Sequence, residues 1–168
     1  MSLLSLTSND LYAMKPRLAD YIVARLRRSL PGQYVVPGST PVLSFGNASK
    51  AVVATLGLNP SRQEFLDTDG CVLTDENRRF ETLKSLGVRS LVTASEETLQ
   101  RVVNACNGYF KAHPYNWFNQ LKPILQSIGA SYDDGTACHL DLVQWATDPV
   151  WGRIPDRSVR NRLLADDA

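Results

Sequence analysis

The sequence predicts an α/β domain in which helices flank a short, mostly parallel sheet, and two apolar runs are the main support. Residues 51–56 (AVVATL) have the composition of a strand buried on both faces of a parallel sheet. Residues 137–145 (ACHLDLVQW) predict a second interior strand. Helical segments around these runs favour a three-layer α/β/α domain, with a pocket at the carboxyl ends of the strands containing Val53 and Leu142.

Length and composition are those of an ordinary globular domain. The 168 residues are 43% hydrophobic and 21% charged, so residues 1–168 are expected to form a single domain with its core at about 40–164. The net charge of +1 argues neither for nor against a nucleic-acid partner, because only the local charge of the folded surface matters.

The residue content argues against metal and cofactor sites, several known catalytic motifs and a membrane-spanning segment. Cys71, Cys106 and Cys138 have no CxxC spacing, and the chain has two His, so neither a metal nor a cofactor is expected. Phosphate-binding, dinucleotide-binding, serine-hydrolase and deaminase motifs are absent from the sequence. No apolar run is long enough to span a bilayer, so we expect a cytoplasmic protein with no membrane partner.

The N-terminal part predicts one helix and one surface segment. Apolar residues three and four apart predict an amphipathic helix over about 9–28, capped by Ser8 or Asn9. Residues 33–50 are rich in Gly, Pro and Ser, and they are expected to follow the surface into the first strand, with Phe45 within reach of the pocket.

Two helices are predicted directly after the first strand and its turn. The first is capped by Thr74 or Asp75 and ends at Gly87. The second follows residues 93–96 (TASE), which have the spacing of a capping box, and it runs to about Lys111.

Two further helices are predicted in the C-terminal half. Asn116 is expected to cap a helix with Pro123 in its middle. Its buried face is expected to be Trp117, Leu121, Ile124 and Ile128. A polar helix follows over about 155–164, after the second strand.

The turn after the first strand, Gly57-Leu58-Asn59-Pro60-Ser61, is the strongest candidate site. It lies at the sheet edge where open α/β folds bind their ligands. Pro60 restrains the Asn59 carboxamide, which can fix a water or a substrate amide, and Gly57 allows close approach. Asn-Pro is also a common turn initiator, so both interpretations stay open.

Two other groups of side chains are candidates for ligand contact. Aromatic residues surround a predicted helix break; Phe110 and Trp117 fit apolar stripes, whereas Tyr115 and Phe118 are free to contact a ligand. Asp141 lies between two leucines of the second strand, where it either pairs with an Arg or points into the pocket. His139, beside it, is expected to be structural.

The sequence GLNPS after a buried strand resembles the G-x-N-P-G motif of the uracil-DNA glycosylase superfamily, and the similarity covers about residues 40–150. The resemblance implies a DNA partner and hydrolysis of the bond between a flipped uracil or related base and its sugar. It assigns to Asn59 the positioning of the attacking water. The other motif residues, Gly57, Leu58, Pro60 and Ser61, would bind the substrate.

The resemblance also assigns two recognition roles outside the motif. Tyr115 or Phe118 corresponds to an aromatic that stacks on the flipped base, and Asp141 to a strand residue that reads its edge. In the family that strand residue is Asn, and the position of Ser61 is usually Gly. The family's late His-containing loop and two further strands are expected beyond Ala168.

These departures keep other functions open. The alternative is a non-catalytic binding or interaction domain with the same fold, which predicts a closed or partly collapsed pocket beside Asn59. A hydrolase acting on free nucleosides is a third possibility. The sequence makes no prediction about the oligomeric state.

Overall fold

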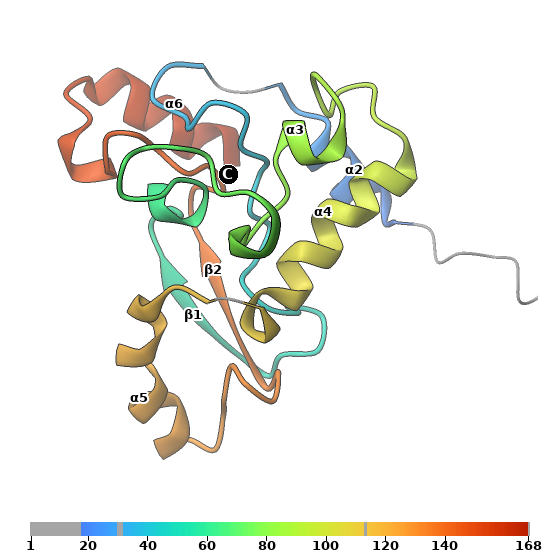
Figure 1. Ribbon diagram of the computed structural model, residues 1–168. Coiled ribbons are helices and arrows are strands. Elements are labelled where there is room, and N and C mark those ends of the chain that lie inside the picture. The colour runs from blue at the N-terminus through green and yellow to red at the C-terminus, as the bar shows by residue number, and fades with distance from the viewer. Residues whose placement is uncertain (1–17, 30–31, 113, 168) are drawn as a thin grey trace, which may run out of the picture.

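The computed structural model describes residues 18–29, 32–112 and 114–167, and within them it is a mixed α/β structure with five α-helices and a two-stranded sheet. The two strands lie side by side at the centre of Figure 1, with α4 (Glu96–Gly108) on one side and α5 (Lys122–Ser127) on the other. The α/β class predicted from the sequence is therefore confirmed.

The sheet pairs β1 (Val53–Gly57) with β2 (Ala137–Asp141) in parallel, as predicted. Their register places Gly57 opposite Asp141. The pairing continues past both strands, since the backbone N–H of Val143 donates to the carbonyl of Leu58 over 2.8 Å. The turn after β1 is thereby held against the end of β2.

The prediction that the first strand is buried on both faces is wrong. Val52 and Leu56 are 80% and 67% exposed, and Leu142, just after β2, is 50% exposed. Burial along β1 alternates, which is the pattern of a sheet covered on one face. Apolar composition alone does not distinguish a strand of this kind from an interior strand.

Residues 33–50 are not a surface segment, because most of residues 35–46 are buried. The segment runs antiparallel to residues 139–147, with Phe45 and His139 exchanging two backbone hydrogen bonds of 2.8 and 2.9 Å. This pairing satisfies the buried backbone, which composition could not reveal. Gly46, with a φ of 86°, provides the bend that follows Phe45.

Helix α2 (Asp20–Leu26) confirms the end of the predicted N-terminal helix; its expected caps, Ser8 and Asn9, lie outside the described residues. Helix α4, which continues as the 3₁₀ helix Tyr109–Lys111, confirms the second predicted helix. The capping box predicted at residues 93–96 is wrong, because the helix begins after Ser95, which is its cap. Helix α6 (Arg157–Asp167) confirms the C-terminal one.

The cap of α4 gives a matched pair of stability predictions. Ser95 accepts a hydrogen bond of 3.2 Å from the Thr98 backbone N–H, whereas Thr93 is exposed outside the helix. Ser95→Ala is expected to lower the free energy of unfolding by about 1 kcal/mol, because it leaves that N–H without its acceptor. Thr93→Ala is expected to change it little. Urea unfolding of both variants is the measurement, and equal effects would contradict the assignment of the cap.

The helix predicted to begin at Thr74 or Asp75 is wrong over most of its length. The chain forms a 3₁₀ helix, Asp75–Asn77, and then the short helix α3 (Leu83–Leu86). Thr74 makes no capping hydrogen bond, while Thr82 and Ser85 form a reciprocal capping box. The end at Gly87, with a φ of 69°, is as predicted.

The helix predicted from Asn116 is instead the 3₁₀ helix Asn116–Gln120 followed by α5, with Pro123 in the first turn of α5. A 3₁₀ helix has three residues per turn, so the helical phase changes at the junction. The buried side chains are consequently Phe118 and Leu125. The predicted face is wrong, since Trp117, Ile124 and Ile128 are 43%, 64% and 61% exposed.

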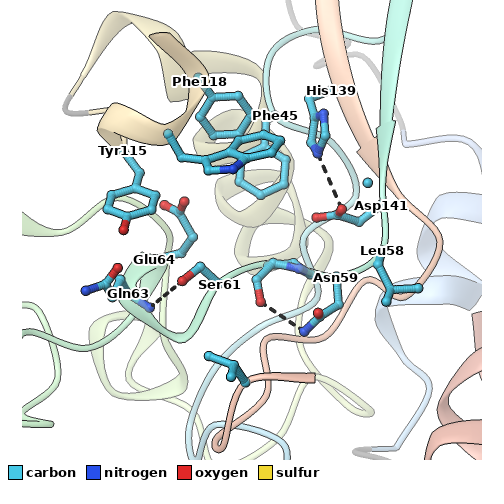
Figure 2. Close-up of a pocket in the computed structure, with 14 residues that line it drawn as sticks. Phe45, Leu58, Asn59, Ser61, Gln63, Glu64, Tyr115, Phe118, His139 and Asp141 are labelled. Carbon is cyan, nitrogen blue, oxygen red and sulfur yellow. Dashed lines mark hydrogen bonds and ion pairs between the residues drawn. The ribbon is translucent and has the colours of Figure 1, made fainter. Parts of the chain in front are cut away.

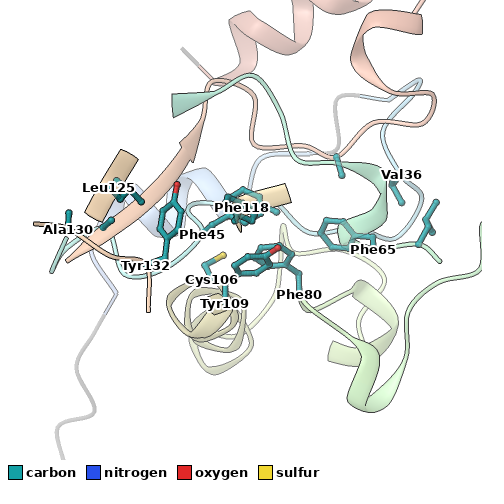
Figure 3. Close-up of a cluster of buried hydrophobic side chains, with 14 residues drawn as sticks. Val36, Phe45, Phe65, Phe80, Cys106, Tyr109, Phe118, Leu125, Ala130 and Tyr132 are labelled. Atoms are coloured by element: carbon teal, nitrogen blue, oxygen red, sulfur yellow. The ribbon is translucent and has the colours of Figure 1, made fainter. Parts of the chain in front are cut away.

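Aromatic rings form the part of the core that lies beneath the candidate site (Figure 3). Phe45 packs edge-on against Tyr109, with ring centroids 4.8 Å apart, and Tyr109 stacks on Phe80 at 5.0 Å. Phe118 meets Phe45 at 5.1 Å. These contacts fix the segments that carry Phe45 and Phe118 relative to the strands.

Candidate active site

A cavity of about 460 Å³ opens at the carboxyl ends of β1 and β2, where the sequence predicted a pocket (Figure 2). Its polar or turn-forming lining residues are Gly57, Asn59, Pro60, Ser61, Gln63, Glu64, His139 and Asp141. Its apolar and aromatic lining residues are Phe45, Leu58, Tyr115, Trp117, Phe118 and Val150. All eight sequence-predicted site residues therefore lie around one cavity. The cavity is open to solvent.

Asn59 is held rigidly on the wall of this pocket. Its Nδ2 donates to the Pro60 carbonyl at 3.0 Å, to the Thr147 hydroxyl at 3.1 Å and to the Trp145 carbonyl at 3.4 Å. Carbonyl oxygens only accept hydrogen bonds, so they define which end of the amide is nitrogen. Trp145 and Thr147 do not line the pocket, although Pro60 does. The three contacts all involve the amide nitrogen, and the carbonyl oxygen makes no hydrogen bond to the described residues, so it is left to accept from a water or ligand.

Gly57 is required by the close approach of β2 to the turn. A Cβ atom at this position would lie 2.3 Å from Asp141 Oδ1 and 2.7 Å from His139 Nε2. Its φ lies outside the positive range that favours glycine, so the reason for glycine here is space rather than backbone conformation. Gly57 therefore admits both polar side chains of β2 to the pocket.

His139 and Asp141 form the polar end of β2. His139 Nε2 lies 3.4 Å from Asp141 Oδ1, and both side chains are almost completely buried. His139 Nδ1 is 2.7 Å from the Thr55 hydroxyl, which is 2.6 Å from the Tyr132 hydroxyl. One arrangement that satisfies these contacts has Tyr132 donating to Thr55 and Thr55 donating to Nδ1, with the ring hydrogen on Nε2. The Thr55 hydroxyl also lies 3.4 Å from the Cys138 carbonyl, a second acceptor.

Sequence reasoning expected Asp141 either to pair with an Arg or to face the pocket, and the structure places it in the pocket beside His139. His139 was expected to be purely structural, but it also lines the cavity. Its ring is surrounded by Phe45, Trp117 and Phe118, with centroids 5.4, 5.6 and 5.2 Å away. The signal available in the sequence was its position two residues before Asp141, on the same face of a strand.

Glu64 is the main functional candidate that sequence reasoning missed. It ends the 3₁₀ helix Arg62–Glu64, is 2% exposed and lines the pocket. The Tyr109 hydroxyl donates to its Oε2 over 2.8 Å, and Arg79 Nε lies 4.0 Å from the same oxygen. Burial raises the pKa of Glu64 from 4.5 to about 7, and the nearby Asp141 adds to this, while Tyr109 and Arg79 act in the opposite direction.

Tyr109 connects Glu64 to the aromatic side of the pocket. Burial raises the pKa of Tyr109 far above its usual range, so its hydroxyl remains a neutral donor to the carboxylate. The same hydroxyl accepts a 2.9 Å hydrogen bond from the backbone N–H of Tyr115. Figure 2 shows Glu64 and Asp141 on opposite sides of the pocket, with Tyr115 on the side of Glu64.

The roles of the aromatic candidates differ from those expected. Phe118 reaches the pocket but is 3% exposed and belongs to the core, whereas Trp117, expected in the core, is 43% exposed and lines the pocket. Tyr115 is partly exposed, as a ligand-contacting residue should be. Trp117 and Tyr115 are thus the rings most accessible to a ligand.

Ser61 has a structural role besides lining the pocket. Its hydroxyl accepts a 3.2 Å hydrogen bond from the Gln63 backbone N–H and caps the 3₁₀ helix that carries Glu64. Pro60 is buried at the turn, and Leu58 is 40% exposed. The turn therefore supplies both the Asn59 amide and the start of the segment that positions Glu64.

A second cavity, of about 530 Å³, lies at the opposite end of the strands, beside Gly46, Asn107 and Thr136. It lacks the buried carboxyl groups of the first, so we place the candidate active site at Asn59.

The described residues contain no group of three His, Cys, Asp or Glu side chains suited to a metal. No described helix has the length and apolarity needed to cross a bilayer.

Comparisons with known proteins do not identify a relative of this chain: no family model, curated protein or solved structure matches it.

Proposed function

We propose that the chain is a uracil-DNA glycosylase-like hydrolase that cleaves the bond between a nucleobase and its sugar in DNA. The observation that carries this proposal is the orientation of Asn59, whose amide nitrogen is held by three acceptors and whose oxygen is left for a water. The cavity beside it has accessible aromatic rings for a flat base and polar groups for the base edge.

The proposed reaction needs no co-reactant. A water held by the Asn59 carbonyl oxygen attacks C1′ of the sugar, forms the new C–O bond and releases one proton to the solvent, from which Glu64 is later reprotonated. The C1′–N bond breaks, and the base departs with the bonding electron pair and takes up one proton. Glu64, with a pKa of about 7, is the group in the pocket suited to donate that proton near neutral pH.

One further observation supports a DNA substrate, and a second concerns the glycosylase-like fold. Arg62 and Arg79 lie beside lining residues of the pocket, where Arg62 pairs with Asp148 at 2.7 Å and Arg79 approaches Glu64 at 4.0 Å. Both side chains are partly exposed, so these cations can also contact phosphates. The apolar side chains of Val52, Leu56 and Leu142 are exposed around the sheet, so a three-layer fold requires a further layer over this face. A three-layer α/β/α arrangement is part of the proposal.

The test is a cleavage assay on a panel of oligonucleotides that carry uracil, mismatched bases or alkylated bases, with free nucleosides as a separate arm. The expected result is an abasic product from at least one oligonucleotide, and a loss of about 100-fold or more in single-turnover rate for Asn59→Ala. Absence of abasic product from every substrate would rule out the enzymatic proposal. Cleavage of nucleosides but not of oligonucleotides would indicate that the substrate is a free nucleoside rather than DNA.

A further inference from the structure

The described lining of the pocket has acidic side chains without Lys or Arg to balance them. Its lining includes the carboxyl groups of Glu64 and Asp141, and no Lys or Arg is among the described residues that line it. The nearest guanidinium to Glu64 belongs to Arg79, which contacts Oε2 from outside the lining at 4.0 Å. Arg79 thus contacts one of the two carboxyl groups, and the pocket interior favours positive charge.

Asp141 is poorly supplied with hydrogen-bond donors for a buried acid. Its side chain is 3% exposed, and the only polar contact of its carboxyl group within the described part of the chain is the 3.4 Å approach of His139 Nε2. A buried carboxylate is costly unless donors or a positive charge compensate it. A ligand with N–H donors or a positive charge can supply that compensation from inside the cavity.

Glu64, on the opposite side of the pocket from Asp141 (Figure 2), is also a buried carboxyl group with few hydrogen-bond donors. Its contacts to Tyr109 and Arg79 are both made by Oε2, and no hydrogen bond to Oε1 is found within the described part of the chain. The groups that face it are Tyr109 from the end of α4, Arg79 from the loop before α3, and Asp141 from β2. A positive ligand placed between the two acids would favour the ionised form of both.

The accessible aromatic rings favour the same kind of ligand. Trp117 and Tyr115 line the cavity beside these acids, and the faces of aromatic rings attract cations. The Tyr115 ring already has such a contact, since the Arg79 guanidinium lies 5.8 Å from its centroid. Aromatic rings combined with carboxylates bind flat cations more tightly than flat neutral rings.

We propose that this pocket prefers a flat, N-alkylated heteroaromatic cation, of which an N-alkylated purine is the nucleobase form, over a neutral ring such as uracil. The inference rests on the proposed function and names its substrate class. The chemistry agrees, because an N-alkylated purine cation departs with the electron pair of the broken C1′–N bond as a neutral molecule. It needs no proton from Glu64, whereas a neutral base does.

The test compares two small probes of the same shape by isothermal titration calorimetry. 1-Methylnicotinamide is a permanent cation, and nicotinamide is its neutral counterpart. At about pH 8 the parent chain is expected to bind the cation at least about tenfold more tightly. Asp141→Asn and Glu64→Gln are each expected to reduce this ratio several-fold. Asp69→Asn, which removes the same charge from an exposed turn, is expected to preserve it.

The pH dependence provides a second readout that a merely structural role of Glu64 would not give. Binding of the permanent cation is expected to strengthen between about pH 5.5 and about pH 8.5, as Glu64 loses its proton, whereas binding of nicotinamide is not. In Glu64→Gln the slope for the cation is expected to be lost. Equal affinity for the two probes, or a preference that persists in both pocket variants, would overturn the inference.

Failure of this inference is distinguishable from failure of the proposed function. The probe titrations measure binding and need no turnover, whereas the oligonucleotide panel measures cleavage. Cleavage of uracil but not of 7-methylguanine, with no preference between the probes, would overturn the cation preference and leave the hydrolase intact. Preference for the cation with no cleavage of any substrate would support the pocket chemistry and overturn the hydrolase.

Discussion

Glu64→Gln is expected to raise the free energy of unfolding at about pH 8 by about 3 kcal/mol relative to the parent chain, and to change it much less at about pH 4. The folded state raises the pKa of Glu64 from 4.5 to about 7, so it favours the protonated carboxyl group. The contribution of that group to stability is complete below pH 4.5 and is lost as the pH rises through about 7.

The measurement is urea unfolding of the parent chain and the variant across this pH range. Gln keeps an oxygen that can accept from the Tyr109 hydroxyl, so the variant removes the ionisation with little change of shape. Glu76→Gln, the same change at an exposed position, is the control and is expected to produce no such trend. If the difference in unfolding free energy between the parent chain and Glu64→Gln does not grow with pH, the raised pKa of the buried Glu64 is contradicted.

Gly57→Ala is expected to abolish ligand binding and cleavage, and to lower the free energy of unfolding by about 1–3 kcal/mol. The added methyl group would lie 2.3 Å from Asp141 Oδ1 and 2.7 Å from His139 Nε2, so both side chains must move. Because the two side chains form one end of the pocket, the loss of function is expected to exceed what the loss of stability explains.

Gly108→Ala is the matched control for this prediction. Gly108 is the last residue of α4, and a Cβ there would meet no atom within 4 Å. The change is expected to be neutral or to stabilise the chain by about 0.5 kcal/mol, because alanine restricts the unfolded state. Unfolding curves and the cleavage assay together check the pair. Normal activity of Gly57→Ala would show that Gly57 is not needed for the pocket.

The position of the site could be predicted because its signals are local in the sequence. The apolar run before Gly57 and the Asn59-Pro60 turn after it define a strand end, and a second run ending near Asp141 defines its neighbour. Parallel pairing then brings both strand ends to one edge. The sequence could not reveal that only one face of this sheet is covered, because that depends on distant segments.

The site residues that the sequence did not reveal owe their positions to contacts between segments that are far apart in the chain. Glu64 is one of many acids in the chain, and only the tertiary fold shows that it is buried beside Tyr109. The burial of Phe118 and the exposure of Trp117 cannot be predicted from helical periodicity, because a 3₁₀ helix precedes α5 and changes the phase of the pattern. The pairing of residues 35–46 with β2 and the segment after it is likewise a long-range contact.

The most direct test of the account is an NMR titration that maps where a base-like ligand binds. With uracil and with 1-methylnicotinamide added separately to the ¹⁵N-labelled chain, the backbone amide signals of Gly57, Leu58, Asn59 and Asp141 are expected to shift with at least one probe. Those beside the second cavity, such as Gly46 and Asn107, are expected to stay unchanged. Shifts confined to the second cavity, or none at Asn59 with either probe, would contradict the assignment of the active site.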